Sequence, residues 1–365
     1  MSPLEAIVAL NMLPKLGPIR TQRLLDAFLD ARTILHTPKN QLMRVDGIGP
    51  ETADSITGWQ NLVDPSAEIK EARDREITII TRDDENYPVS LRHVYDAPML
   101  LYVWGEIKKH DRHAIGIVGS RRTSHYGKQS TKKISYQLAH SGFTIVSGLA
   151  RGIDTTAHEA AIAANGRTIA VIGSGLAKLY PPENFALAEK IASGFGAVIS
   201  EFPLHTAPSK QTFPMRNRIV AAWANAILVT ECPAWSGSLI TANLASDYGK
   251  PIFAIPGPID KPTSAGCNQL IRDGATLVSD ANHITDDLGE LPLRFQANPM
   301  LKENDSPTLP ENEAKVMAMI GYDEVSIDDL ITRSKMTASE VGTTLTKLEM
   351  RRLIKVLPGF RYCAS

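Results

Sequence analysis

The central part of the chain, from residue 114 onward, gathers its hydrophobic residues in short uninterrupted runs. Between these runs lie amphipathic stretches, in which apolar positions recur with the period of a helix. Strands that are apolar at every position are typical of a parallel sheet covered by helices on both faces. We therefore predict an α/β fold with a doubly wound parallel sheet. Strands are expected in AIGIVGS, TIVSG, TIAVIGSG, AVISE, AILVTE and PIFAIPG and at 77–81 and 99–103, and helices at 127–141, 154–164, 183–193, 215–224 and 238–247.

Two smaller regions flank this core. Before it, short helical patterns are separated by glycine and proline. After it, a polar, proline-containing stretch is typical of a linker. The last residues show three helical patterns and then two extended runs around Pro358 and Gly359, which predicts a winged helix. The expected domains are therefore a helical domain at 1–65, the sheet domain at 66–290, a linker at 291–311 and a winged-helix domain at 312–365.

Composition limits the class of protein without choosing a function. Of the 365 residues, 22% are charged and 43% hydrophobic, and a formal net charge of -1 argues against a uniformly basic, histone-like protein. A local basic stripe would still be enough to bind nucleic acid. The scattered cysteines (Cys232, Cys267 and Cys363) fit a reducing cytoplasm better than a disulfide framework. No apolar run approaches the length of a membrane span, so a cytoplasmic protein is expected.

A helix–hairpin–helix motif is predicted near the N-terminus. The segment MRVDGIGPETADSI places Gly47 and Gly49 in the hairpin. Such glycines let backbone N–H groups and a helix N-terminus approach a DNA phosphate. In an earlier copy, LPKLGPIRTQRLL, Pro18 stands where a second glycine would be and removes one donor. Gly47 and Gly49 are candidates for duplex-DNA contact, and the alternative is a helical domain that only packs or contacts protein.

The end of the first central strand carries candidate phosphate ligands. Gly119 and Ser120 are expected to offer free backbone N–H groups, and Arg121 follows them. A nest of N–H groups beside an arginine is suited to an anion. The alternative is a tight turn into a helix with a solvated basic face, because further cations follow without an intervening acid: Arg122, Lys128, Lys132 and Lys133.

A second cluster lies in the segment APSKQTFPMRNRIVAA. Lys210, Phe213, Arg216 and Arg218 fall within nine positions, with no acid among them. Single-stranded DNA requires this combination, because a base stacks on an aromatic ring while cations hold the phosphates. We expect Lys210 and Phe213 in a loop, ahead of a helix that starts near Pro214. The alternative places Phe213 in the core.

Other strand ends add to this picture. Ser236, Gly237 and Ser238 precede an amphipathic helix and predict an anion pocket at its N-terminus. Asp154 and His158 lie four residues apart, which we interpret as a helix cap and a surface hydrogen bond rather than as an acid–base pair. Several anion pockets at neighbouring strand ends form a row, which suits a polyanion better than one mononucleotide.

The quoted segments also resemble a known family. GIVGSRR, SGLARGIDTTAH, AVIGSGLAKLYPPEN, ISEFP, TFPMRNRIVAA, TECPAWSGSLITA and IPGPID…GCNQLIRDGA occur in the order seen in DNA-processing protein A (Smf) proteins, over about residues 77–288. The resemblance implies an extended Rossmann core between sterile-alpha-motif-like helices and a winged helix. It also implies single-stranded-DNA binding through the Rossmann domain, without known catalysis. Homodimerisation through that domain, protection of incoming DNA and loading of the RecA recombinase during natural transformation are implied as well.

The resemblance assigns binding roles to particular residues. The family's DNA-contacting arginine corresponds to Arg121, and its lysine and stacking phenylalanine correspond to Lys210 and Phe213. We expect no cofactor and no metal. The full set expected to bind single-stranded DNA is Gly119, Ser120, Arg121, Lys210, Phe213, Arg216, Asn217, Arg218, Gly237 and Ser238.

Two enzyme classes remain as alternatives. A Rossmann-fold nucleotide hydrolase related to the phosphoribohydrolases would use a Gly-Gly-x-Gly-Thr loop and a nearby glutamate. Here the loop reads Trp235-Ser236-Gly237-Ser238 and Glu231 precedes it. A nicotinamide-dependent oxidoreductase would need a third glycine where Lys178 stands. Both departures favour a protein that is not an enzyme.

Overall fold

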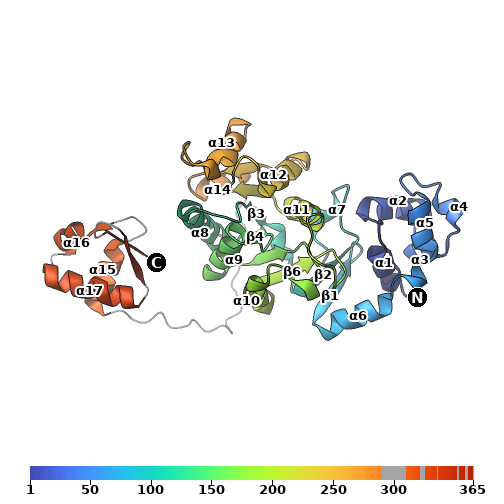
Figure 1. Ribbon diagram of the computed structural model, residues 1–365, viewed down its shortest axis with the longest axis horizontal. Coiled ribbons are helices and arrows are strands. Elements are labelled where there is room, and N and C mark those ends of the chain that lie inside the picture. The colour runs from blue at the N-terminus through green and yellow to red at the C-terminus, as the bar shows by residue number, and fades with distance from the viewer. Residues whose placement is uncertain (290–309, 321–324, 335, 352, 358–360, 365) are drawn as a thin grey trace. The chain divides into compact units, whose positions relative to one another are not determined.

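The computed structural model describes residues 1–289, 310–320, 325–334, 336–351, 353–357 and 361–364. The chain forms two compact units, Met1–Asn298 and Pro299–Ser365. Figure 1 shows the first unit as a sheet with helices on both sides, preceded by a group of short helices. The predicted linker, 291–311, lies outside the described residues except for its last two positions.

A nine-stranded sheet with the order β1-β2-β6-β5-β4-β3-β7-β8-β9 forms the centre of the first unit. Neighbouring strands from β6 to β9 pair in parallel, whereas β2 pairs antiparallel with both β1 and β6. The prediction of a doubly wound parallel sheet is confirmed, and β1 and β2 extend this sheet at one edge through antiparallel pairing. The strands are β1 Ile77–Thr81, β2 Leu100–Gly105, β3 Ala114–Val118, β4 Thr144–Ser147, β5 Thr168–Val171, β6 Gly196–Ser200, β7 Ala226–Val229, β8 Ile252–Ala254 and β9 Thr276–Leu277.

Alternate residues of the central strands pack against helices on the two faces. Ile115 and Ile117 of β3 belong to a buried cluster with α8 and α9, while Val118 belongs to another with α11 and α12. Figure 1 shows α8 and α9 on the opposite side of β3 and β4 from α11. The covering helices are α7 Val89–Arg92, α8 His125–His140, α9 Ile153–Ala163, α10 Phe185–Lys190, α11 Thr212–Trp223, α12 Gly237–Asp247, α13 Ala265–Arg272 and α14 Asn282–Leu288.

The strand order reverses at β3. The chain runs from β3 outward through β4, β5 and β6, then returns to add β7 and β8 on the other side of β3. Loops that leave the carboxyl ends of β3 and β7 therefore diverge to opposite faces and leave a crevice between them. Ligands of open α/β sheets bind at such switch points.

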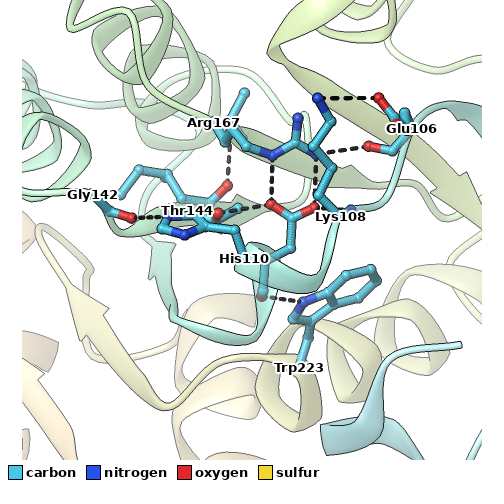
Figure 2. Close-up of polar contacts among 10 residues, drawn as sticks. Glu106, Lys108, His110, Gly142, Thr144, Arg167 and Trp223 are labelled. Atoms are coloured by element: carbon cyan, nitrogen blue, oxygen red, sulfur yellow. Dashed lines mark hydrogen bonds and ion pairs between the residues drawn. The ribbon is translucent and has the colours of Figure 1, made fainter. Parts of the chain in front are cut away.

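At the amino ends of the same strands, a buried polar cluster ties the sheet together. The Asp111 carboxylate accepts both Nε and Nη2 of Arg167, each at 2.7 Å, and the Thr144 hydroxyl at 2.8 Å. The Asp111 carbonyl accepts the indole N–H of Trp223 at 3.0 Å. Figure 2 shows Arg167, Thr144 and Trp223 converging from three separate parts of the chain: the loop before β5, the start of β4 and the end of α11. A buried ion pair with this many partners holds its elements in one arrangement.

The N-terminal helices have a core of their own, with Leu10, Leu24, Ile34 and Ile56 buried together. The predicted short helices are confirmed, and the predicted hairpin joins α4 to α5. The helices are α1 Pro3–Met12, α2 Pro18–Phe28, α3 Ala31–His36, α4 Lys39–Leu42, α5 Pro50–Thr57 and α6 Pro65–Asp74.

The C-terminal unit is a winged helix, as predicted. Three helices precede a hairpin in which β11 and β12 pair antiparallel, and β10 adds a short third strand. The predicted turn at Pro358 and Gly359 lies outside the described residues. The elements are α15 Glu311–Ile320, β10 Val325–Ser326, α16 Ile327–Ser334, α17 Ala338–Met350, β11 Ile354–Leu357 and β12 Arg361–Ala364.

Candidate nucleic-acid interface

A groove of about 450 Å³ opens at the switch point, outside the carboxyl ends of β3 and β7. Its walls come from the loop after β3, the first turns of α11, and the loop between β7 and α12. Of the ten residues expected to bind single-stranded DNA, nine line this groove. The nine are Gly119, Ser120, Arg121, Lys210, Phe213, Arg216, Asn217, Gly237 and Ser238.

The loop after β3 requires glycine at its first position. A Cβ at Gly119 would lie 2.5 Å from Ile153 Cγ1 and 2.9 Å from the Glu231 carbonyl oxygen. This close approach fixes the loop so that the exposed Arg121 side chain reaches the groove. The expectation of a free backbone donor at Ser120 is wrong, because that N–H donates to the Glu231 carbonyl at 2.7 Å. Anion binding at this strand end therefore depends on Arg121 more than on the Ser120 backbone.

Arg121 and Phe213 form the centre of a row of cations and rings. The Arg121 guanidinium carbon lies 5.0 Å from the centroid of the Phe213 ring, over its face. The Tyr180 ring is tilted against the Phe213 ring, with 5.8 Å between their centroids. The guanidinium carbon of Arg151 lies 5.9 Å from the centroid of the Tyr180 ring. Tyr180 and Arg151 line a smaller hollow beside the groove. Sequence reasoning missed both of them, although each follows a strand end that it had singled out.

The first turn of α11 presents Phe213, whose predicted place in a loop is wrong. The helix begins at Thr212, and the Ser209 hydroxyl accepts the N–H groups of Gln211 and Thr212 just before it. Pro214 does not prevent this start, because N–H groups of a first helical turn have no partner within the helix. Phe213 is consequently held by the helix, half-buried at the wall of the groove, and Lys210 stays exposed at its rim.

Arg216 lines the groove as a buried group. It is 4% exposed, and its Nη1 donates to the carbonyl oxygens of Gly148 and Val171. Burial lowers the pKa of Arg216 to about 10, and the nearby Asp154 carboxylate partly opposes the shift. The guanidinium remains charged at neutral pH and adds positive potential at the floor of the groove.

The structure does not bring Arg218 to the groove, which corrects its predicted role. This arginine is 7% exposed, and its Nη2 donates to Glu201 while Nη1 donates to the Asp96 carbonyl. Residues two apart on a helix point in different directions, so Arg216 and Arg218 cannot share one face. Arg218 is a structural ion-pair residue.

Asp154 and His158 have buried roles instead of the expected cap and surface contact. Gly152 caps α9, and Asp154 accepts the N–H groups of Gly148 and Ala150, each at 3.2 Å, which shapes the loop after β4. Burial raises the pKa of Asp154, and the charge of Arg216 opposes the shift. His158 Nδ1 lies 2.6 Å from the Thr168 hydroxyl, and burial lowers its pKa to about 3. A neutral, enclosed imidazole cannot exchange protons with a substrate in the groove.

The N-terminus of α12 forms the third wall. The Ser236 hydroxyl accepts the Ser238 N–H at 3.3 Å, and Asn217 Nδ2 donates to the Gly237 carbonyl at 3.4 Å. Nothing lies within 4 Å of a Cβ built on Gly237, so space is open at this helix start. Trp235 stands in the same loop and is 96% exposed.

The geometry of Glu231 bears on the hydrolase alternative. Its Oε2 accepts the Thr123 hydroxyl and the Ser124 N–H, each at 2.8 Å, at the start of α8. Burial opposes ionisation of Glu231, but the hydrogen bonds from Ser124 and Thr123 outweigh it and lower its pKa. A carboxylate held in this way orders a helix start, and it is not poised as a general base.

The hairpin glycines lie among paired charges. Gly47 has φ +82°, and Gly49 caps α5, whose first residue is the donor-free Pro50. Arg23 pairs with Asp46 at 2.7 Å, and acids of α5 engage other nearby lysines. Duplex-DNA contact at Gly47 and Gly49 stays a prediction, and local acids reduce the positive potential there.

Two kinds of site do not occur among the residues that the structure describes. No group of three or more His, Cys, Asp and Glu side chains is placed to hold a metal ion. None of the helices has the length and apolar character that crossing a bilayer requires.

Comparisons with known proteins agree with this architecture. Residues 78–289 match the family model of DNA recombination-mediator protein A, and residues 301–359 match that of the DprA winged helix domain. Protein Smf of Synechocystis sp. is 33% identical over 387 residues, which cover 97% of each chain. The crystal structure of DNA processing protein A from Streptococcus pneumoniae has a TM-score of 0.69 and 32% identity, covering 80% of this chain and 100% of that one. The Helicobacter pylori protein of that name, solved to describe its single-stranded DNA binding mode, has a TM-score of 0.53 and 32% identity, covering 58% and 95%.

Proposed function

Because the chain belongs to the DNA recombination-mediator protein A family, we propose that it binds single-stranded DNA in the groove at the switch point. One observation carries the proposal: exposed cations, Arg121 and Lys210, flank a half-buried ring, Phe213, within one cavity. Cations bind phosphates and rings stack with bases, so the combination suits an unpaired strand. The single-stranded DNA binding described for the H. pylori relative supports the same conclusion.

In this proposal the phosphate backbone follows the cations around the groove. Arg121 and Lys210 contact phosphates directly, and the buried Arg216 adds positive potential beneath them. Phe213 receives a base. The open start of α12, at Gly237 and Ser238, receives the sugar–phosphate chain. A duplex would present its bases inward, where Phe213 could not stack on them.

We infer the biological role from the resemblance to the family, which supports it. The protein protects incoming DNA and loads the RecA recombinase onto it during natural transformation, and it acts as a homodimer through the α/β domain. Light scattering of the full chain tests the dimer, and RecA filament formation on a labelled strand, with and without the protein, tests loading.

Fluorescence anisotropy tests the binding itself. A labelled poly-dT oligonucleotide and its duplex are titrated with the full chain at several salt concentrations. We expect tight binding to the single strand that weakens as salt rises, because phosphate contacts release counterions. Equal affinity for the duplex, or no binding to either, would overturn the proposal.

A further inference from the structure

Trp235 is a large aromatic residue of the groove to which the family resemblance assigned no role. It lies in the loop between β7 and α12, and 96% of its side chain is exposed. Large aromatic side chains are usually well buried, and one left in water forgoes the stabilisation of burial. An indole held almost fully in solvent at a binding groove therefore indicates a ligand that covers it.

The other tryptophans differ from Trp235 because their side chains pack against the protein. Trp223 is buried and donates its N–H to the Asp111 carbonyl. Trp104 packs against the Phe185 ring at 6.0 Å, and Trp59 lies against the core of the N-terminal helices. Among the described residues, no aromatic ring or cation pairs with Trp235.

Phe213, in contrast, is already crowded. Arg121 covers one face of its ring at 5.0 Å, Tyr180 tilts against it at 5.8 Å, and Gly173 packs closely beside it. A base that stacks on Phe213 must displace part of this arrangement. Trp235 offers an open aromatic surface at the same groove, where no group has to move first.

The surroundings of Trp235 favour a nucleotide base over an apolar protein partner. Ser236, Ser238 and Asn217 lie beside it in the groove wall, and the cations Arg121 and Lys210 line the same cavity. The other large apolar side chain of this wall, Ile240, is 44% exposed. A ring bordered by hydroxyl groups and cations matches the combination that unpaired nucleic acid requires.

We propose that Trp235 is a second base-stacking residue of the groove, which holds a base of the strand whose phosphates Arg121 and Lys210 bind. The proposal rests on the proposed function, since it needs single-stranded DNA in the groove. It deepens that function by giving the groove two stacking surfaces from different walls, Phe213 on α11 and Trp235 before α12. Two surfaces let the groove hold bases from at least two positions of one strand.

Intrinsic fluorescence and anisotropy of the full chain test this. Unlabelled oligo-dT is expected to quench part of the tryptophan emission of the wild type, because a stacked base quenches an indole. Trp235→Phe should abolish the quenching and keep binding within a few-fold, whereas Trp59→Phe should keep the quenching. Trp235→Ala should weaken binding by about 5- to 150-fold, the range of base–aromatic stacking. Its salt dependence should not change, since no charge is removed.

The outcomes separate this proposal from the function on which it rests. If the wild type shows no anisotropy change with poly-dT, the proposed function fails, and the role of Trp235 fails with it. If the wild type binds but Trp235→Ala binds equally well, or Trp235→Phe keeps the quenching, only the stacking role is overturned. Wild-type DNA affinity in Trp235→Ala together with lost RecA loading would instead make Trp235 part of a protein-docking surface.

Discussion

The two ends of the same strands treat positive charge in opposite ways. At the amino ends, Arg167 is enclosed and gives two hydrogen bonds to the Asp111 carboxylate (Figure 2). At the carboxyl ends, Arg121 and Lys210 are exposed beside a groove, and Arg121 lies over an aromatic ring. The first arrangement uses its charge to hold the fold, and the second leaves its charge available to a ligand.

The difference lies in what surrounds each cation. A buried guanidinium must be paired within the protein, because desolvation of an unpaired charge is costly. An exposed one meets no such requirement and can exchange water for phosphate at little cost. Arginine as a residue type therefore predicts nothing until its carboxylate partners are known, and those partners come from distant parts of the chain.

Removal of the enclosed charge gives the largest expected effect. Arg167→Ala leaves the Asp111 carboxylate buried without its cation, and we expect a loss of about 3–5 kcal/mol in the free energy of unfolding. Chemical denaturation followed by circular dichroism measures it. A variant as stable as the wild type would contradict the structural role given to the amino-end cluster.

The stability of the protein should also depend on pH through His158, which lies near the amino end of β5. Thr168 donates its hydroxyl to the Ile145 carbonyl, so it accepts from Nδ1–H of a neutral His158. With its pKa lowered to about 3 by burial, folded His158 stays neutral between pH 6.5 and 3, where the unfolded chain binds a proton. Its contribution to stability is complete above about pH 6.5 and is lost as pH falls, by about 1.4 kcal/mol per unit.

His158→Asn, which keeps a donor near Thr168, isolates this contribution. Denaturation midpoints are measured from pH 7.5 down to pH 5 for both proteins. The stability of the variant should fall less steeply below pH 6.5 than that of the wild type. Parallel curves would show that His158 is not held neutral in the folded protein.

The smallest expected effect concerns the groove at the carboxyl ends of the strands. Lys210→Ala removes one phosphate contact at the rim, so the slope of log affinity against log salt should decrease by about 0.7 for a single strand. Lys70→Ala, an exposed lysine of α6, is the matched control and should leave the slope unchanged. An unchanged slope in Lys210→Ala would remove Lys210 from the phosphate path.

Much of this arrangement was predictable from the sequence. The apolar runs and their helical partners gave the sheet, because a parallel strand buried on both faces is apolar at every position. Residues at neighbouring strand ends met in one groove, because parallel strands share their carboxyl edge. Gly119, Arg121 and Lys210 were found in this way, along with the open start of α12.

What the sequence could not supply depends on tertiary partners. Arg218 differs from Arg216 only in the direction that its side chain faces. Its carboxylate partner, Glu201, follows β6, at the end of another strand. The Ser120 N–H was expected to be free because its acceptor, the Glu231 carbonyl, is 111 positions away in the chain. The exposure of a side chain also depends on the fold, so nothing in the sequence set Trp235 apart from the buried Trp223 or the partly buried Trp59 and Trp104.

The central claim is that Arg121 contributes to ligand binding and not to the stability of the fold. A paired measurement of DNA affinity and thermal stability tests it most directly. Arg121→Ala and the control Arg73→Ala, an exposed arginine of α6, are compared by anisotropy with labelled poly-dT and by thermal denaturation. We predict that Arg121→Ala binds about 10- to 100-fold more weakly, the equivalent of one charge-assisted contact, while its melting temperature and all properties of Arg73→Ala match the wild type. Wild-type affinity in Arg121→Ala, or a loss of affinity explained by a lowered melting temperature, would contradict the account.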